Sequence, residues 1–221
     1  MIKKIIILTI ILLLVTSCYQ QTLFFNKDLS GKINYKVTIT KEYTQFISVL
    51  NQDDTSINLN LKPILDSETL AEVVQKSNDV EILNEQHSED QGGIINEIQL
   101  SFKNYNDLAQ ALPNSYFRNS LFREKNSITV STILSLDFLG DSTKIRQLYQ
   151  NMDNNSRKYI DYYADKVKLF FVYHSYKTIT QPPKTGNFQL SEDKKILTIE
   201  ISLLDILQSS GDLKLQFALR R

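Results

Sequence analysis

The stretch Lys32-Ile33-Asn34-Tyr35-Lys36-Val37-Thr38-Ile39-Thr40 alternates polar and apolar side chains along its whole length. Because successive side chains of a β-strand point to opposite faces, this period of two predicts a strand with one buried and one solvated face. Strands with a single apolar face are typical of an antiparallel sheet that is covered on one side. A sheet of this kind is therefore the expected framework of the fold.

The same period of two recurs in five later segments. They are residues 94–102, 128–136, 167–173, 197–201 and 213–219. Two pairs of segments are separated by short polar connections, which favours hairpins. Residues 80–85 are expected to pair with 94–103 through 87–93, and residues 188–190 with 196–201 through 191–195.

Three segments carry the apolar stripe of an amphipathic helix. Two of them cover residues 66–76 and 104–112, and a third begins after residue 141. The expected N-caps are Asp66 or Ser67 for the first helix and Asn104 for the second. The polar residues 153–156 interrupt the stripe of the third helix, which indicates either a kink or a restart, because Asn and Ser compete for backbone hydrogen bonds.

Strands and helices are interspersed without a regular β-α-β alternation, which favours an α+β fold over a doubly wound parallel sheet. We expect an antiparallel sheet of about six to seven strands, with two to three helices covering one face. The chain of 221 residues is long enough for one substantial core. Residues 32–221 are therefore expected to form a single α+β domain.

The first residues have the three parts of a secretory signal peptide. Lys3 and Lys4 precede the apolar run of residues 5–15, and small residues follow before Cys18. The run is shorter than the roughly 20 apolar residues that a membrane-spanning helix needs. The alternative is a short buried helix, but the flanking lysines and the following cysteine favour a signal peptide over residues 1–17.

The end of this segment, Val15-Thr16-Ser17-Cys18, resembles the lipobox of bacterial lipoproteins. The resemblance implies cleavage before Cys18, acylation of that residue and attachment to membrane lipid on the extracytoplasmic side, either in the periplasm or at the cell surface. Two or three acyl chains anchor a protein stably where one does not. Residues 18–31 are then expected to be a lipidated tether between the bilayer and the domain.

Composition and motifs narrow the function classes. Lys plus Arg and Asp plus Glu both number 25, and the first 17 residues hold two lysines, so the processed chain has a net charge near minus two. A chain with this net charge does not have the excess of basic residues that is typical of nucleic-acid-binding proteins. The sequence contains neither a Gly-x-Ser-x-Gly elbow nor a phosphate-binding glycine loop. Cys18 is the only cysteine, so the acylated chain has no free thiol for disulfide, metal or nucleophile chemistry.

The two histidines are the other candidates for chemistry. His87 lies in the acidic segment 85–90, which is read either as a divalent-cation site or, preferably, as a solvated hairpin tip. His174 ends the predicted strand 167–173 on the face opposite Phe171 and Tyr173, and is expected to be a polar strand residue. We therefore expect no catalytic residue, no cofactor and no metal ligand.

Tyrosine is unusually frequent, with eleven residues in the chain. Several are close in sequence, namely Tyr159, Tyr162, Tyr163, Tyr173 and Tyr176. Tyrosine combines a large contact area with a polar tip and suits binding surfaces. It is also common on half-buried faces of helices and strands, and this second interpretation is favoured.

The succession of elements after Val167 resembles the C-terminal half of LppM-like bacterial lipoproteins and of related uncharacterised spirochaete lipoproteins. It comprises an apolar strand, Pro182-Pro183, Gly186-Asn187, the turn 191–195 and two further apolar strands. The resemblance covers about 55 residues and implies an α+β ectodomain with a link to binding of envelope lipid or glycolipid. The chain departs from the LppM type in having no C-terminal transmembrane helix, and no site residue carries over.

Three functions are compatible with these features. The first is a non-catalytic envelope protein that binds a lipid, another amphiphile or an envelope protein between its sheet and its helices. The second is a surface-exposed lipoprotein that contacts host or neighbouring-cell molecules through a face that contains tyrosines. The third is a hydrolase, because a pair of catalytic carboxylates leaves no trace in a linear sequence.

Overall fold

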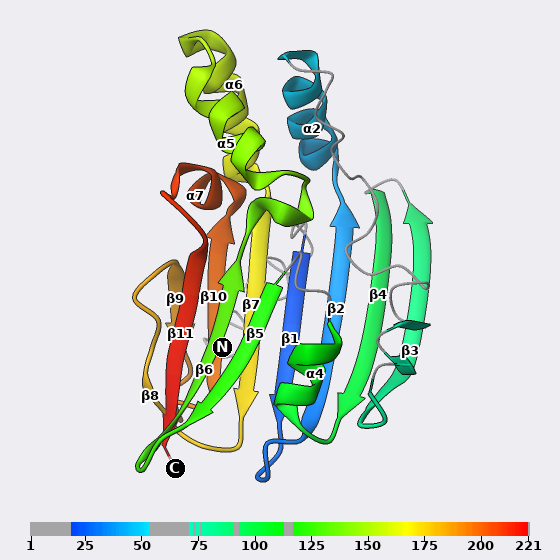
Figure 1. Ribbon diagram of the computed structural model, residues 1–221, viewed down its shortest axis with the longest axis vertical. Helices are drawn as coiled ribbons and strands as arrows, with labels where there is room; N and C mark the ends of the chain where they lie inside the picture. Colours follow the sequence, from blue (N-terminus) through cyan, green and yellow to red (C-terminus); the bar gives the residue numbers. More distant parts are fainter. Residues whose placement is uncertain are drawn as a thin grey trace, which may run out of the picture.

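The computed structural model describes residues 19–53, 71–72, 74–75, 77–90, 93–112 and 117–220. The predicted signal peptide 1–17, Cys18 and most of the helix predicted over 66–76 lie outside these residues. The described chain forms two β-sheets, with helices gathered mainly beyond one end of them (Figure 1). The predicted α+β class is confirmed.

The larger sheet has seven strands in the order β3-β4-β2-β1-β7-β10-β9. Its strands are β1 (Tyr19–Phe25), β2 (Gly31–Ile39), β3 (Val80–Asp90), β4 (Gly93–Phe102), β7 (Lys168–Ser175), β9 (Asn187–Leu190) and β10 (Ile196–Ser202). Neighbouring strands are antiparallel except β1 and β7, which run parallel. The smaller, fully antiparallel sheet has the order β5 (Phe117–Arg123), β6 (Ser127–Leu134), β11 (Leu213–Arg220) and β8 (Ile179–Gln181).

Strand β1 corrects the prediction of a tether over residues 18–31. It lies in the middle of the larger sheet and pairs along its whole length with β2 on one side and β7 on the other. Its alternate residues Tyr19, Gln21, Leu23 and Phe25 are all buried. The sequence hides this strand because a glutamine occupies one of the inward positions, so the apolar period is broken.

Strands β3 and β4 form the first predicted hairpin, but the polar connection expected at 87–93 is wrong. β3 continues to Asp90, and His87 lies opposite Asn96 of β4. β3 is an edge strand whose residues 81–89 are exposed, so polar side chains do not interrupt it. The second predicted hairpin is confirmed, because β9 pairs with β10.

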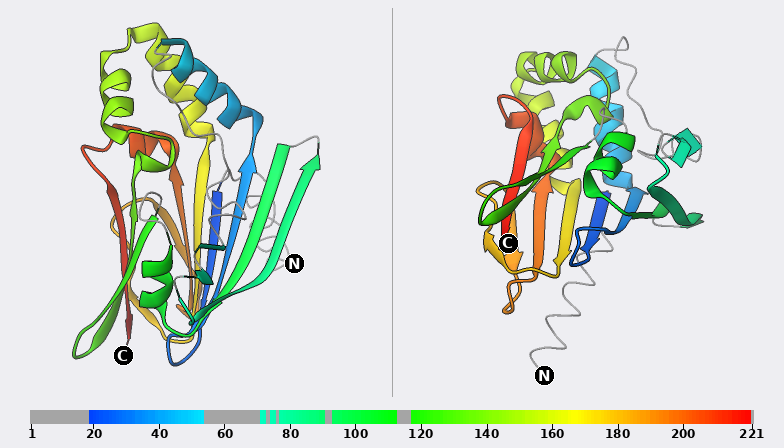
Figure 2. Two further views of the ribbon diagram at one scale, coloured as in Figure 1. Left: turned by 45° about the vertical axis from the view of Figure 1, so that its right-hand side comes forward. Right: turned by 60° about the horizontal axis from the view of Figure 1, so that its bottom comes forward.

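The smaller sheet covers the inner face of the larger one (Figure 2). The ring of Tyr173 on β7 lies 4.6 Å from that of Phe217 on β11, centroid to centroid. Inward residues of both sheets are fully buried, among them Ile33, Leu100, Phe171, Ile199, Val130, Leu134 and Leu219. The sequence predicts helices as the cover of the sheet, whereas the structure uses a second sheet for most of it.

Helix α2 (Lys41–Asp53) follows β2 directly and is not among the predicted helices. Its residues Tyr43, Phe46, Ile47 and Leu50 are buried and have the spacing of one helical face. Helix α2 packs against α6 (Asn154–Lys166) at the end of the sheets where both helices lie (Figure 1).

The remaining helices begin at capped positions. Asn104 caps α4 (Tyr105–Ala111), as predicted. Asp141 caps α5 (Ser142–Asn151), which begins where the third helix is predicted to start. Asp153 caps α6, so the interruption of the third predicted helix is a restart and not a kink. The short helix α7 (Leu203–Gln208), which the sequence did not predict, starts with a capping box in which Ser202 and Asp205 bond each other's backbone N–H.

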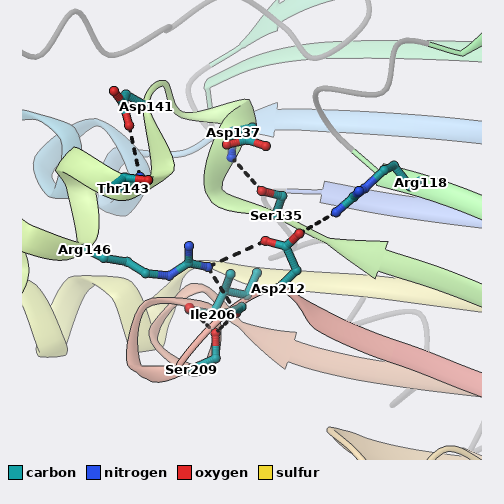
Figure 3. A network of polar contacts seen from close by, with 10 residues as sticks. Arg118, Ser135, Asp137, Asp141, Thr143, Arg146, Ile206, Ser209 and Asp212 are labelled. Carbon is teal, nitrogen blue, oxygen red and sulfur yellow. Dashed lines mark hydrogen bonds and ion pairs between the residues drawn. The ribbon is translucent and has the colours of Figure 1, made fainter.

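A network of charged residues ties α5 to the smaller sheet (Figure 3). Asp212, which precedes β11, pairs with Arg118 of β5 and lies 3.8 Å from Arg146 of α5. Arg146 also donates a hydrogen bond of 3.1 Å to the carbonyl oxygen of Gly211. The turn between α7 and β11 is therefore held to both a helix and the edge strand of the smaller sheet.

Candidate functional site: a buried tyrosine cluster between the sheets

Four tyrosines converge in the interior between the two sheets. Tyr19, Tyr35 and Tyr173 point inward from three strands of the larger sheet, and Tyr105 comes from α4. Strand register brings the first three together, because Gln21 of β1 lies opposite Tyr35 and Leu23 lies opposite Tyr173. All four side chains are at most 3% exposed. We call these four residues the tyrosine cluster.

Part of the cluster is tied by hydrogen bonds. The hydroxyl of Tyr19 donates to Oε1 of Gln21 at 3.3 Å. Thr132 on β6 donates to Oδ1 of Asn119 at 2.7 Å and lies 2.9 Å from the Tyr173 hydroxyl. Since Thr132 has one proton, which Asn119 receives, Tyr173 is the donor in the second bond. This bond joins the larger sheet to the smaller one.

Three other polar atoms of the same region have no hydrogen-bonding partner within the described part of the chain. They are the hydroxyl oxygens of Tyr35 and Tyr105 and the amide nitrogen Nε2 of Gln21, although the side chain of Thr132 is close enough to the Tyr105 hydroxyl to lower its pKa. A buried polar group that is left unpaired costs about 1–3 kcal/mol. Native interiors pair nearly all such groups with protein, ordered water or ligand. Within the described chain, these three donors therefore lack the acceptor that buried donors ordinarily have.

The cluster is electrically neutral. Burial raises the pKa of the phenols of Tyr35 and Tyr173, and burial together with the neighbouring phenols raises those of Tyr19 and Tyr105. All four hydroxyls are therefore protonated at physiological pH and available as donors. Among the described residues, none of the buried side chains is a Lys or Arg that would compensate an anion. The chemistry of the cluster suits an uncharged acceptor, because an unpaired buried charge is far more costly.

The histidines lie elsewhere. His87 is exposed on β3, with Nδ1 2.6 Å from Oδ1 of Asn96. His174 stands on the outer face of β7, stacked on Phe24 at 4.4 Å between ring centroids, and partial burial lowers its pKa. Within the described residues, no group of three or more His, Cys, Asp or Glu side chains is placed to hold a metal ion.

The tyrosines that are close in sequence are separated in the structure. Tyr173 belongs to the buried cluster, whereas Tyr159, Tyr162 and Tyr176 are 56–61% exposed. Sequence reasoning places Tyr35 and Tyr173 on inward strand faces but misses Tyr19, Gln21 and Tyr105 as partners. The signal that was available is the presence of a tyrosine at an inward position of two predicted strands, namely Tyr35 and Tyr173.

Two surface hollows are also present. One is a polar groove of about 680 Å³ on the smaller sheet, lined by Thr129, Thr180, Gln181, Pro182, Lys184, Thr185, Lys214, Gln216, Phe217 and Ala218. The other, of about 630 Å³, is a shallow hollow on α6 lined by Asn155, Lys158, Tyr159, Tyr162 and Tyr163. Among the residues that the structure describes, neither hollow is lined by a His, Cys, Asp or Glu side chain.

No helix in the described ranges combines the length and apolar character needed to cross a bilayer. No known family model and no curated protein matches the sequence. Among solved structures, the chain is similar to the folded domain of the Mycobacterium tuberculosis protein LppM, determined by NMR, with 12% sequence identity and a TM-score of 0.42. The match covers 91% of this chain and 88% of that domain. A similarity of this degree concerns the overall course of the chain and says nothing about what either protein binds.

Proposed function

We propose that the protein is a non-catalytic lipoprotein, anchored by acylated Cys18, whose domain binds a lipid or related amphiphile through the tyrosine cluster. The observation that carries the proposal is the set of three buried donors that lack an acceptor. The anchoring rests on the lipobox-like sequence Val15-Thr16-Ser17-Cys18 and on the apolar run before it.

The surroundings of the cluster favour an amphiphile over a purely polar ligand. The ring of Tyr105 packs against Phe25 and Phe102, at 5.2 and 5.8 Å between centroids, and the ring of Tyr19 packs against Phe171 at 5.7 Å. Hydrogen-bond donors that are surrounded by aromatic rings suit a ligand that has a carbonyl or hydroxyl group and is otherwise apolar. An ester or amide carbonyl accepts two hydrogen bonds and brings no charge, so it fits a site without a buried cation.

The proposal is tested on the full chain purified from membranes. The folded protein is extracted with organic solvent, and the extract is analysed by mass spectrometry for molecules bound in fixed ratio to protein. Acyl chains on Cys18 stay with the protein and are counted separately. We expect one class of amphiphile to be recovered in near-stoichiometric amount.

The matched variants are Tyr35→Phe combined with Tyr105→Phe, and Tyr176→Phe as control. The first keeps both rings and removes two unpartnered hydroxyls, so we expect the bound amphiphile to fall by tenfold or more, in line with about 1.4 kcal/mol per tenfold. The control removes an exposed hydroxyl and should retain the ligand. A wild-type protein that yields no stoichiometric molecule, or a double variant with unchanged content, contradicts the proposal.

A further inference from the structure

We propose that the outward face of α6 rests on the bilayer surface and orients the domain. The face consists of the exposed residues Lys158, Tyr159, Tyr162 and Lys166, and the half-buried Tyr163, which packs against the core, lies at its border. The inference rests on acylation of Cys18, as stated under the proposed function, and adds a contact surface whose partner is a bilayer that contains anionic lipid.

The first support is the position of the anchor. Tyr19 is the first residue of β1, is 2% exposed and lies opposite Leu169 of β7. Because β1 and β7 run parallel, the first residue of β1 lies at the same end of the sheet as the first residues of β7. Helix α6 ends directly before β7, at this end of the sheet (Figure 1). Cys18 precedes Tyr19 directly, and one residue spans at most about 3.6 Å. Acylated Cys18, with no tether between it and β1, would hold this end of the sheet close to the bilayer. Helix α6 lies at the same end.

The second support is the aromatic character of the face. Tyr159 and Tyr162 are 61% and 59% exposed, whereas Ile160 and Ala164 on the opposite side of α6 are fully buried. Together with Tyr163 they line the shallow hollow of about 630 Å³ on this helix. Tyrosine is enriched where proteins meet the membrane–water boundary, because its ring is apolar and its hydroxyl is hydrated.

The third support is the charge of the face. The carboxylates of α6 and its cap have partners: Asp153 caps the helix, Asp161 accepts from the Tyr149 hydroxyl at 2.6 Å, and Asp165 lies 3.3 Å from Lys168. Lys166 places its Nζ 5.6 Å from the centre of the Tyr162 ring. Within the described chain, neither Lys158 nor Lys166 forms an ion pair, so both remain available to anionic headgroups.

The chain has no tryptophan, so a single Tyr→Trp substitution introduces a unique fluorophore. Tyr162→Trp reports on the α6 face. Tyr176→Trp is the matched control, because Tyr176 is 56% exposed and follows β7 at its opposite end. Each lipidated full-length variant is reconstituted into vesicles of phosphatidylglycerol and phosphatidylcholine whose acyl chains carry bromine.

We expect the bromolipid to quench Tyr162→Trp several-fold more than Tyr176→Trp, with a blue-shifted emission for the first variant only. The additional exchange of Lys158→Glu and Lys166→Glu should remove most of this quenching, whereas Lys184→Glu with Lys195→Glu, two exposed lysines elsewhere, should not. Equal quenching at both positions, or none at either, overturns the orientation.

Flotation of the same preparations separates the two proposals. A protein that floats with the vesicles, but whose Tyr162→Trp fluorophore is unquenched, overturns only the α6 contact. A protein that does not float and carries no acyl mass on Cys18 overturns the anchor on which the proposed function depends. A Cys18→Ala variant supplies the unanchored reference.

Discussion

At the scale of single residues, the four phenols of the tyrosine cluster determine the chemistry of the interior. Tyr173 and Thr132 join the two sheets through a hydrogen bond. The hydroxyl groups of Tyr35 and Tyr105 have no acceptor within the described chain. A core composed only of apolar side chains would avoid the cost of these unpaired groups. The fold therefore carries the cost of these unpaired groups within the described chain.

The raised phenol pKa values predict how stability changes with alkaline pH. A folded-state pKa above the unfolded value of about 10 stabilises the fold fully below pH 10. The stabilisation is lost as pH rises towards the folded-state pKa, because only the unfolded chain releases these protons easily. We therefore expect Tyr19, Tyr35, Tyr105 and Tyr173 to ionise only as the domain unfolds.

Phenolate absorbance and far-UV circular dichroism, recorded in one alkaline titration, check this expectation. Part of the phenolate signal of the eleven tyrosines should appear together with the loss of circular dichroism. Protein unfolded in urea should ionise in a single stage and serves as the control. If all eleven phenols ionise while the dichroism stays native, the cluster is not buried as described.

At the scale of elements, the hairpin that joins β1 to β2 has little room for an added side-chain atom. Its turn is closed by a hydrogen bond of 2.8 Å from the Asn26 N–H to the Ser30 carbonyl, and Leu29 adopts a φ of 72°. Gly31 then starts β2 opposite Phe25. A Cβ atom on Gly31 would lie 1.9 Å from the carbonyl oxygen of Phe24, which is a backbone atom with little freedom to move.

Gly31→Ala is therefore expected to destabilise the fold by about 3 kcal/mol or more, as overpacking in a closed core does. Gly211→Ala is the matched control, since a Cβ there meets nothing within 4 Å and should leave stability almost unchanged. The free energy of unfolding from urea titration measures both. Similar stability of the two variants would show that the hairpin adjusts without cost.

At the scale of the whole molecule, β1 is the strand that makes the larger sheet continuous. Its antiparallel pairing with β2 and its parallel pairing with β7 connect β3-β4-β2 to β7-β10-β9. The same strand carries Tyr19 and Gln21 into the interior. The continuity of the larger sheet and the composition of the tyrosine cluster thus both depend on the seven residues of β1.

Replacement of residues 19–25 by a Gly/Ser segment is expected to abolish cooperative unfolding, because it divides the sheet in two. The same replacement of residues 84–89, which form an exposed part of edge strand β3, should lower stability but keep a cooperative transition. Near-UV circular dichroism and urea unfolding distinguish the two. A native-like transition in the first variant would restore the interpretation of this segment as a tether.

The local patterns were sufficient for most elements of the fold. A period of two predicts β2, β4, β6, β7, β10 and β11, and the caps Asn104 and Asp141 mark the starts of α4 and α5. These elements are determined by neighbouring residues, because strand alternation and helix capping act over a few positions of the chain. For the candidate site, the patterns place Tyr35 and Tyr173 on inward faces but do not bring them together.

Only the tertiary structure decided the role of residues 19–25, the existence of the second sheet and the meeting of four tyrosines. Gln21 interrupts an apolar pattern, so β1 becomes recognisable only when β2 and β7 supply its hydrogen bonds on both sides. The parallel pair β1–β7 joins residues about 150 positions apart, a contact that no local pattern encodes. The sequence by itself determined which segments form strands and helices, since that depends on nearby side chains. Which strands pair, and which polar atoms are left buried without a partner, depends on contacts that exist only after the chain has folded.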